Sequence, residues 1–128
     1  MTSTIVNESS SPVISIVDDD ESVRDALDSL LKSVGYRTEV FASGQAFLHS
    51  GHHEDSRCLI LDVRMPGLSG LELQRQLVSS GFSIPIIFIT AHGDDAARAQ
   101  AFGAGAVAFL RKPFTEEALL KAVQAAVA

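Results

Sequence analysis

VISIVDDDE, residues 13–21, joins a short, mostly apolar run to three aspartates and a glutamate. A run of this kind is typical of a strand that is covered on both faces, as the strands of a parallel sheet are. The carboxylates that follow repel one another, and ionised groups are costly to take out of water. The stretch therefore predicts a buried strand that ends at an acidic site, and residues from elsewhere in the chain must offset the repulsion.

The composition indicates a globular protein of one domain. The chain has 128 residues, of which 46% are hydrophobic and 20% charged. A net charge of −6 argues against a general nucleic-acid-binding surface. The single cysteine, Cys58, excludes an internal disulfide and fits a reducing compartment. Since no apolar run has the length of a membrane span and no signal-peptide pattern is present, we expect a soluble, cytoplasmic protein.

Strand-like runs alternate with helical patterns along the chain. The predicted strands cover 13–17, 37–41, 58–61, 84–90 and 106–110. The predicted helices cover 21–35, 43–50, 71–81, 94–102 and 115–128, with Thr115 as the cap of the last. Five β–α pairs in a row predict an α/β fold with a parallel sheet and helices on both faces. We expect a flexible tail over 1–11 and a single domain over 12–128.

Polar side chains follow the predicted strands. They are Asp18, Asp19 and Asp20 after the first strand, Asp62 after the third, Thr90 at the end of the fourth and Lys112 after the fifth. Ligands of such sheets bind outside the carboxyl ends of the strands, so these groups are expected to meet at one edge. Converging carboxylates suit a hard divalent cation. A carboxylate, a hydroxyl and an ammonium group are also what phosphoryl transfer to an aspartate requires.

Four segments that carry these residues resemble the receiver domain of two-component response regulators. They read SIVDDDESVRDAL, CLILDVRMPGLSGLEL, PIIFITAHGD and GAVAFLRKPF. The resemblance covers about 13–127, and it is strongest to receivers of helix-turn-helix transcription regulators whose fourth strand ends in T-[AG]-H-G-D. It implies a flavodoxin-like, doubly wound (βα)5 fold with strand order 2-1-3-4-5.

The resemblance also implies a role for each site residue. Asp62 would accept a phosphoryl group from a sensor histidine kinase or a phosphotransfer protein. The Mg²⁺ (or Mn²⁺) ligands would be Asp18, Asp19, Asp62 and the backbone carbonyl of Arg64. The phosphoryl-binding and switch groups would be Thr90, the Ala91 backbone, Lys112 and Phe109. The Lys112–Pro113 peptide bond would be cis.

Phosphorylation is expected to change an output face made by the fourth helix (94–102), the fifth strand (106–110) and the fifth helix (115–128). The resemblance also makes a phosphorylation-dependent homodimer through this face possible. The chain departs from the family there: Phe102 and Gly103 replace a usual methionine and lysine, and Ala108 a frequent aspartate. The departures leave the phosphorylation residues intact, but the usual dimer geometry is no longer implied.

Other interpretations stay open. A phosphatase of the haloacid dehalogenase type would use Asp18 and Asp20, but it would leave Asp62 without a role. A phosphorylation-independent binding scaffold could use the same fold. The chain could be a stand-alone receiver, which its Met start favours, or part of a longer DNA-binding regulator.

Three further features have structural explanations that we prefer. Asp20 is better explained as the cap of the first helix than as a ligand. His52 and His53 are expected in a solvated loop rather than at a metal site. Cys58 is expected to be a small buried residue with no redox role.

Overall fold

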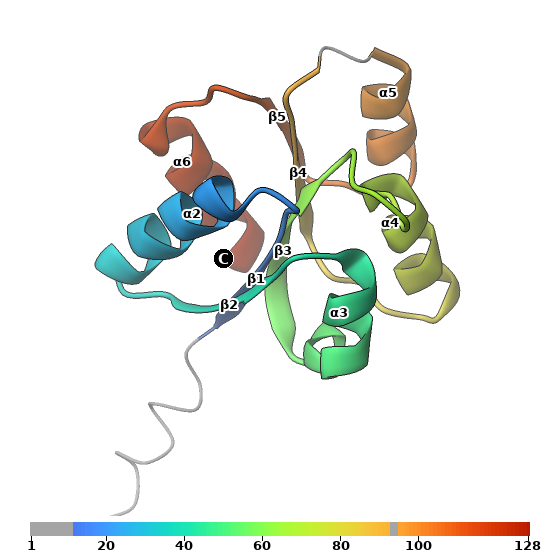
Figure 1. The fold of residues 1–128 in the computed structure, drawn as a ribbon, viewed down its shortest axis with the longest axis horizontal. Coiled ribbons are helices and arrows are strands. Elements are labelled where there is room, and N and C mark those ends of the chain that lie inside the picture. The colour runs from blue at the N-terminus through green and yellow to red at the C-terminus, as the bar shows by residue number, and fades with distance from the viewer. Residues whose placement is uncertain (1–11, 93–94) are drawn as a thin grey trace, which may run out of the picture.

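The computed structural model describes residues 12–92 and 95–128, so the predicted tail over 1–11 lies outside the described residues (Figure 1). Five parallel strands form one sheet in the order β2-β1-β3-β4-β5. The strands are β1 (Val13–Val17), β2 (Arg37–Phe41), β3 (Ser56–Asp62), β4 (Ile86–Thr90) and β5 (Ala108–Arg111). The α/β fold and the strand order are confirmed.

Helices cover both faces of the sheet, as a doubly wound fold requires (Figure 1). They are α2 (Glu21–Ser33), α3 (Gly44–Ser50), α4 (Gly70–Ser79), α5 (Asp95–Gly103) and α6 (Glu116–Val127), with a short 3-10 helix, η1 (His52–Glu54). α2 and α6 lie on one face, and α3, α4 and α5 lie on the other. None of the helices in the described part of the chain is long and apolar enough to cross a membrane.

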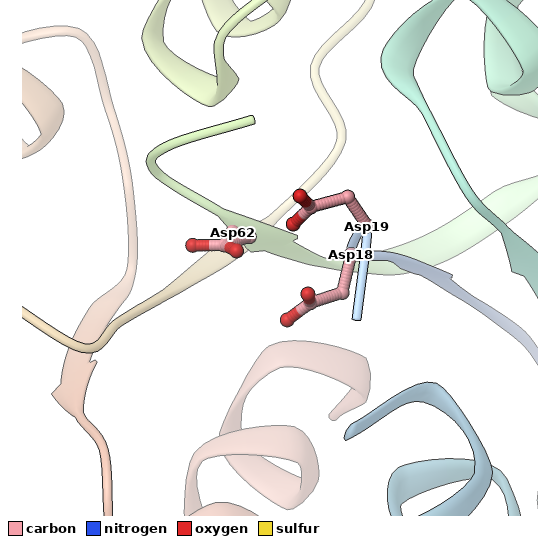
Figure 2. Close-up of side chains that lie close together, drawn as sticks. All are labelled: Asp18, Asp19 and Asp62. Carbon is pink, nitrogen blue, oxygen red and sulfur yellow. The ribbon is translucent and has the colours of Figure 1, made fainter. Parts of the chain in front are cut away.

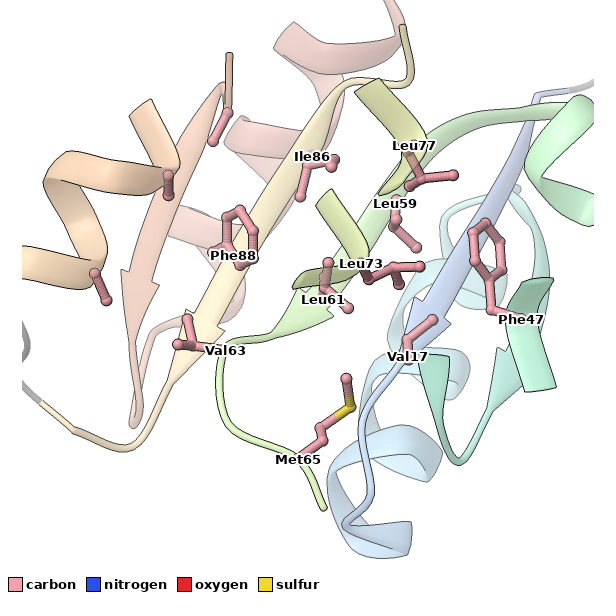
Figure 3. Packing of buried hydrophobic residues seen from close by; sticks show 13 residues of the cluster. Val17, Phe47, Leu59, Leu61, Val63, Met65, Leu73, Leu77, Ile86 and Phe88 are labelled. Carbon is pink, nitrogen blue, oxygen red and sulfur yellow. The ribbon is translucent and has the colours of Figure 1, made fainter. Parts of the chain in front are cut away.

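Alternate strand residues point to the two faces and so build two cores. Ile14, Ile16 and Ile60 pack with side chains of α2 and α6. Leu59, Leu61 and Phe88 pack with side chains of α3, α4 and α5, as Figure 3 shows. β1, β3 and β4 are thus covered on both sides, which explains their nearly continuous apolar sequence.

Side-chain caps fix where several helices begin. Asp20, Ser43, Ser69 and Thr115 each accept a hydrogen bond from a backbone amide of the first turn. Ser69 and Glu72 form a reciprocal capping box at the start of α4. The predicted caps Asp20 and Thr115 are confirmed.

Three strands begin at other residues than predicted. β3 begins at Ser56 rather than residue 58, because the Ser56 hydroxyl pairs with that of Ser15 across the strands at 2.6 Å. β4 begins at Ile86 rather than residue 84, after Pro85, which has no amide hydrogen to give to the sheet. β5 begins at Ala108, two residues later than predicted, and ends at Arg111, one residue later, so that Lys112 follows it directly.

The prediction of a solvated loop for both histidines is only partly correct. His52 Nδ1 lies 3.1 Å from an Asp55 carboxylate oxygen near the surface. The His53 ring instead packs edge-on against Phe82, with 4.9 Å between the ring centroids, and also contacts Phe47. A ring with an apolar body can fill such a gap between aromatic side chains, which the polar sequence around it did not reveal. Cys58 is fully buried, as expected.

Candidate functional site

Side chains from three strand ends meet at the carboxyl edge of the sheet. Asp18 follows β1, Asp62 is the last residue of β3, and Lys112 follows β5. Lys112 Nζ lies 3.0 Å from Asp18 Oδ2 and 3.6 Å from Asp62 Oδ2. Asp19 completes the group beside the other two aspartates (Figure 2). One ammonium group therefore lies between two carboxylates that are 44 residues apart in the sequence.

The site is held rigidly by buried polar contacts. Asp18 is 0%, Thr90 1% and Asp62 6% exposed, whereas Asp19 is exposed. Asp18 Oδ1 accepts a hydrogen bond from the Asp20 amide at 2.9 Å. The Lys112 amide donates to the Thr90 carbonyl at 2.7 Å, which ties the ends of β4 and β5 together. The Lys112–Pro113 peptide bond is cis.

Burial and neighbouring charges change the proton affinity of this group. Burial, followed by the charge of Asp18, raises the pKa of Asp62 from 3.8 to about 6, against the opposing effects of Lys112 and the Arg64 amide. Burial disfavours the charge of Lys112, but the hydrogen bond to Asp18 and the charges of Asp62 and Asp18 outweigh it and raise the pKa of Lys112. Lys112 therefore remains an ammonium group at neutral pH.

The aspartates lie close enough together to hold a hard cation after small side-chain movements. One carboxylate oxygen from each of Asp18, Asp19 and Asp62 lies within 4.8 Å of the others. Ligands of an octahedral Mg²⁺ at about 2.1 Å are separated by about 3–4 Å, so small movements of these side chains suffice. The all-oxygen donor set favours Mg²⁺ or Mn²⁺ over zinc. Arg64 is two residues after Asp62, and its amide donates to Asp62 Oδ1 at 3.3 Å.

The residues predicted to act as the switch lie in and after the neighbouring strands β4 and β5. The Thr90 hydroxyl accepts a hydrogen bond from the His92 amide at 3.1 Å, and Ala91 between them is exposed. Phe109 is half-buried in β5, and its ring centroid lies 6.2 Å from that of Phe88. β4 and β5 pair along their length, so Thr90 and Phe109 belong to adjacent strands.

A family model of the response regulator receiver domain matches residues 14–124. The chain belongs to this family. It is 52% identical to the response regulator protein TodT of Pseudomonas putida, over 90% of this chain and 51% of that protein. It is 41% identical to the transcriptional regulatory protein FixJ of Azorhizobium caulinodans, over 89% of this chain and 54% of that protein. The chain thus spans about half the length of these curated relatives.

The solved structures agree with this assignment. A structure of the response regulator StyR is similar to this receiver with a TM-score of 0.86 and 48% identity, over 92% of this chain and 60% of that chain. Receiver domains of response regulators are regulatory switches rather than ordinary enzymes, and they interact with histidine kinases or phosphotransfer proteins. They typically bind Mg²⁺ at an acidic pocket, which the aspartate cluster fits.

Within the receiver, Asp20 is separate from the acidic site in its role. Its Oδ1 accepts hydrogen bonds from the Ser22 amide at 2.9 Å and the Ser22 hydroxyl at 2.7 Å. These bonds lower the pKa of Asp20 and complete the cap of α2. The phosphatase interpretation required Asp20 to act with Asp18, and the geometry gives it a structural role instead.

Gly70 packs against the site and is a position that the sequence reasoning missed. Its amide donates to the Val63 carbonyl at 3.0 Å. A Cβ atom at this position would lie 2.2 Å from the Asp62 carbonyl oxygen, a distance that real Cβ atoms essentially never show. The first turn of α4 therefore lies directly on the backbone of Asp62. A glycine at the first position of a capped helix was the available signal, because glycine is unfavourable in helices unless close contact demands it.

Proposed function

We propose that this receiver is a phosphorylation-dependent signalling switch in which Asp62 accepts a phosphoryl group from a histidine kinase or a phosphotransfer protein. The observation that carries the proposal is the position of Asp62. Its carboxylate is almost buried at the end of β3, yet it lies 3.6 Å from the Lys112 ammonium and beside the oxygens of Asp18 and Asp19. A nucleophile, a fixed cation and a set of metal ligands are what transfer to an aspartate needs.

The transfer moves the phosphoryl group from nitrogen to oxygen. An Asp62 Oδ forms the new P–O bond, the P–N bond of the donor phosphohistidine breaks, and the imidazole keeps the bonding electron pair and takes up a proton. Lys112 neutralises charge on the phosphoryl oxygens, and the Thr90 hydroxyl and Ala91 amide donate hydrogen bonds to them. A Mg²⁺ ion held by the three aspartates and the Arg64 carbonyl would supply further positive charge. Later hydrolysis of the acyl phosphate would reset the switch.

The phosphoryl group is expected to act on the output face through Thr90. The Thr90 hydroxyl accepts a hydrogen bond from the His92 amide, so turning it toward a phosphoryl oxygen would exchange that contact. Phe109, in the adjacent strand, would change its rotamer as Thr90 moves. The resulting population shift would alter the face made by α5, β5 and α6, through which the chain would bind its partner or a second copy of itself.

One assay tests the switch. The protein is incubated with Mg²⁺ and acetyl phosphate, and the adduct is examined by mass spectrometry, with Asp62→Asn as the control. We expect an acid-stable, base-labile adduct on the wild type that is absent from the variant. No adduct on the wild type, or an undiminished one on Asp62→Asn, would overturn the proposal in favour of a phosphorylation-independent scaffold. Turnover of a generic phosphomonoester that is lost in Asp18→Asn would instead support the phosphatase.

A further inference from the structure

One buried polar side chain has no part in the site described above. The buried polar residues of the described chain are Ser15, Asp18, Ser56, Asp62, Gln74 and Thr90. Asp18, Asp62 and Thr90 belong to the acidic site, and the hydroxyls of Ser15 and Ser56 bind each other. Gln74 remains, with 1% of its surface exposed. A buried amide is unfavourable unless a specific partner satisfies it, so its contact is informative.

Gln74 joins α4 to α5. Its Nε2 donates to the carbonyl oxygen of Ala101, in the last turn of α5, at 3.0 Å. The same carbonyl accepts hydrogen bonds from the amides of Ala104 at 3.2 Å and Ala106 at 3.0 Å. The end of α5 and the turn that leads to β5 therefore meet α4 at one atom.

The other end of α4 lies on the phosphoacceptor. Gly70 contacts the Asp62 peptide so closely that no Cβ atom fits between them. Gln74 comes four residues after Gly70, so the two lie on the same buried face of α4. A displacement of the Asp62 backbone would therefore press on the first turn of α4, and a rigid helix would carry it to Gln74.

The side chains that α5 buries in the core are small. Its buried residues are Ala97 and Ala101, whose methyl groups make few dispersion contacts. By contrast, α4 buries Leu73 and Leu77. The hydrogen bond from Gln74 is therefore a specific polar link between α4 and α5, and α5 forms one side of the proposed output face.

We propose that Gln74 is a positioning residue that couples phosphorylation of Asp62 to α5, by a route separate from Thr90 and Phe109. The proposal rests on the proposed switch function. In this route the Asp62 backbone moves α4 through Gly70, and the Gln74 amide moves α5 through the Ala101 carbonyl. Phe109 lies in β5, so the two routes reach different elements of the same face.

The test replaces the amide with an apolar side chain of similar length. Gln74→Met keeps an unbranched side chain but removes the donor. Gln76→Met is the matched control, because Gln76 is an exposed residue of the same helix. Hydrogen exchange is measured by mass spectrometry on peptides from α5 and from β5, before and after phosphorylation with acetyl phosphate. Adduct formation on Asp62 is measured in the same samples. If Gln74→Met does not fold, Gln74→Leu serves in its place.

In the wild type and Gln76→Met, we expect phosphorylation to change exchange in α5 by about fivefold or more, the lower range of allosteric coupling. In Gln74→Met, phosphorylation of Asp62 and the response of β5 should persist, while the response of α5 is lost. A purely structural role would change basal exchange but leave the response to phosphorylation. An α5 response in Gln74→Met equal to that of the wild type would overturn the coupling alone. Failure of the wild type to become phosphorylated would overturn the proposed switch and this coupling together.

Discussion

The acidic edge and the α5–β5 side of this receiver are built with very different degrees of constraint. At the acidic edge, Asp18, Asp62 and Thr90 are almost fully buried, and Lys112 contacts both carboxylates. On the α5–β5 side, Phe102 is 39% and Val107 50% exposed. The first region depends on polar contacts between strand ends, and the second on a helix that buries only alanines.

This difference in burial matches two different tasks. The phosphorylation chemistry needs side chains held in fixed positions, whereas binding a partner needs exposed ones. At the acidic edge, a shift of about 1 Å in a charged group changes every interaction, because charges interact strongly in a buried site. An exposed face can change its side chains with little effect on stability, and exposed aromatic residues are available for binding. This is the pattern expected of relatives that share one reaction and differ in their partners.

Lys112→Met should give the largest effect. The variant removes the fixed cation between Asp18 and Asp62, so phosphorylation of Asp62 by acetyl phosphate should slow by about 10²–10³-fold. The free energy of unfolding should fall too, because two buried carboxylates lose their common partner. Lys121→Met, an exposed residue of α6, is the matched control and should leave both quantities unchanged. Rates are followed by mass spectrometry, and an equal rate in the two variants would contradict the role assigned to Lys112.

Asp62→Asn should stabilise the metal-free protein at neutral pH. Folding raises the pKa of Asp62 from 3.8 to about 6, so this group's contribution to stability is fully present below pH 3.8 and is lost as the pH rises through about 6. Asparagine carries no charge, so it avoids the cost of burying an ionised carboxylate next to Asp18. Above pH 7 the variant should therefore gain up to about 3 kcal/mol in free energy of unfolding. The gain should vanish below about pH 4.

Urea titrations in a chelator at several pH values provide this measurement. Asp25→Asn, at an exposed position of α2, is the control for loss of one negative charge. A gain for Asp62→Asn that does not depend on pH, or one that Asp25→Asn reproduces, would show that the repulsion from Asp18 and burial of Asp62 are not its cause.

Two identical substitutions compare the regions directly. Gly70→Ala places a Cβ atom against the Asp62 carbonyl, so it should destabilise the fold by about 1–3 kcal/mol and slow phosphorylation as β3 shifts. Gly103→Ala lies at the end of α5, where nothing is within 4 Å of a new Cβ, and should be neutral or stabilising by up to about 1 kcal/mol. Thermal unfolding of both variants, with phosphorylation rates, tests the contrast. If both variants unfolded at the same temperature and were phosphorylated at the same rate, the two regions would not differ in constraint.

The fold and most of the site could be predicted because their signals are local. Apolar runs that alternate with helical patterns give the sheet, and each of Asp18, Asp62, Thr90 and Lys112 immediately follows or ends a strand. The parallel topology then brings these four together without any knowledge of side-chain packing.

What could not be predicted depends on contacts between distant parts of the chain. Ser56 joins β3 only because its hydroxyl meets Ser15, 41 residues earlier. The amide of Gln74 looks like a surface residue until Ala101, 27 residues later, supplies its acceptor. Gly70 is recognisable as a glycine at the start of a helix, but only the folded structure shows that the Asp62 carbonyl lies against it. Sequence periodicity predicts which side of a helix or strand is buried, but not which atoms its side chains will contact.

Phe102→Ala should have the smallest effect on the isolated domain. The Phe102 ring is partly exposed and lies under the Arg98 guanidinium, 5.0 Å from the ring centroid, an interaction of about 0.5–1 kcal/mol. Alanine also favours the helix, so the net change in free energy of unfolding should be below about 1 kcal/mol, with an unchanged rate of phosphorylation.

If phosphorylation drives dimerisation through the α5–β5–α6 face, however, loss of this aromatic side chain should weaken the dimer about tenfold. Sedimentation of the phosphorylated protein measures this, with Val34→Ala, an exposed apolar position at the end of α2, as the control. Equal weakening by both variants would place the interface elsewhere, and weakening by Phe102→Ala alone would show that the loosely held region carries the recognition.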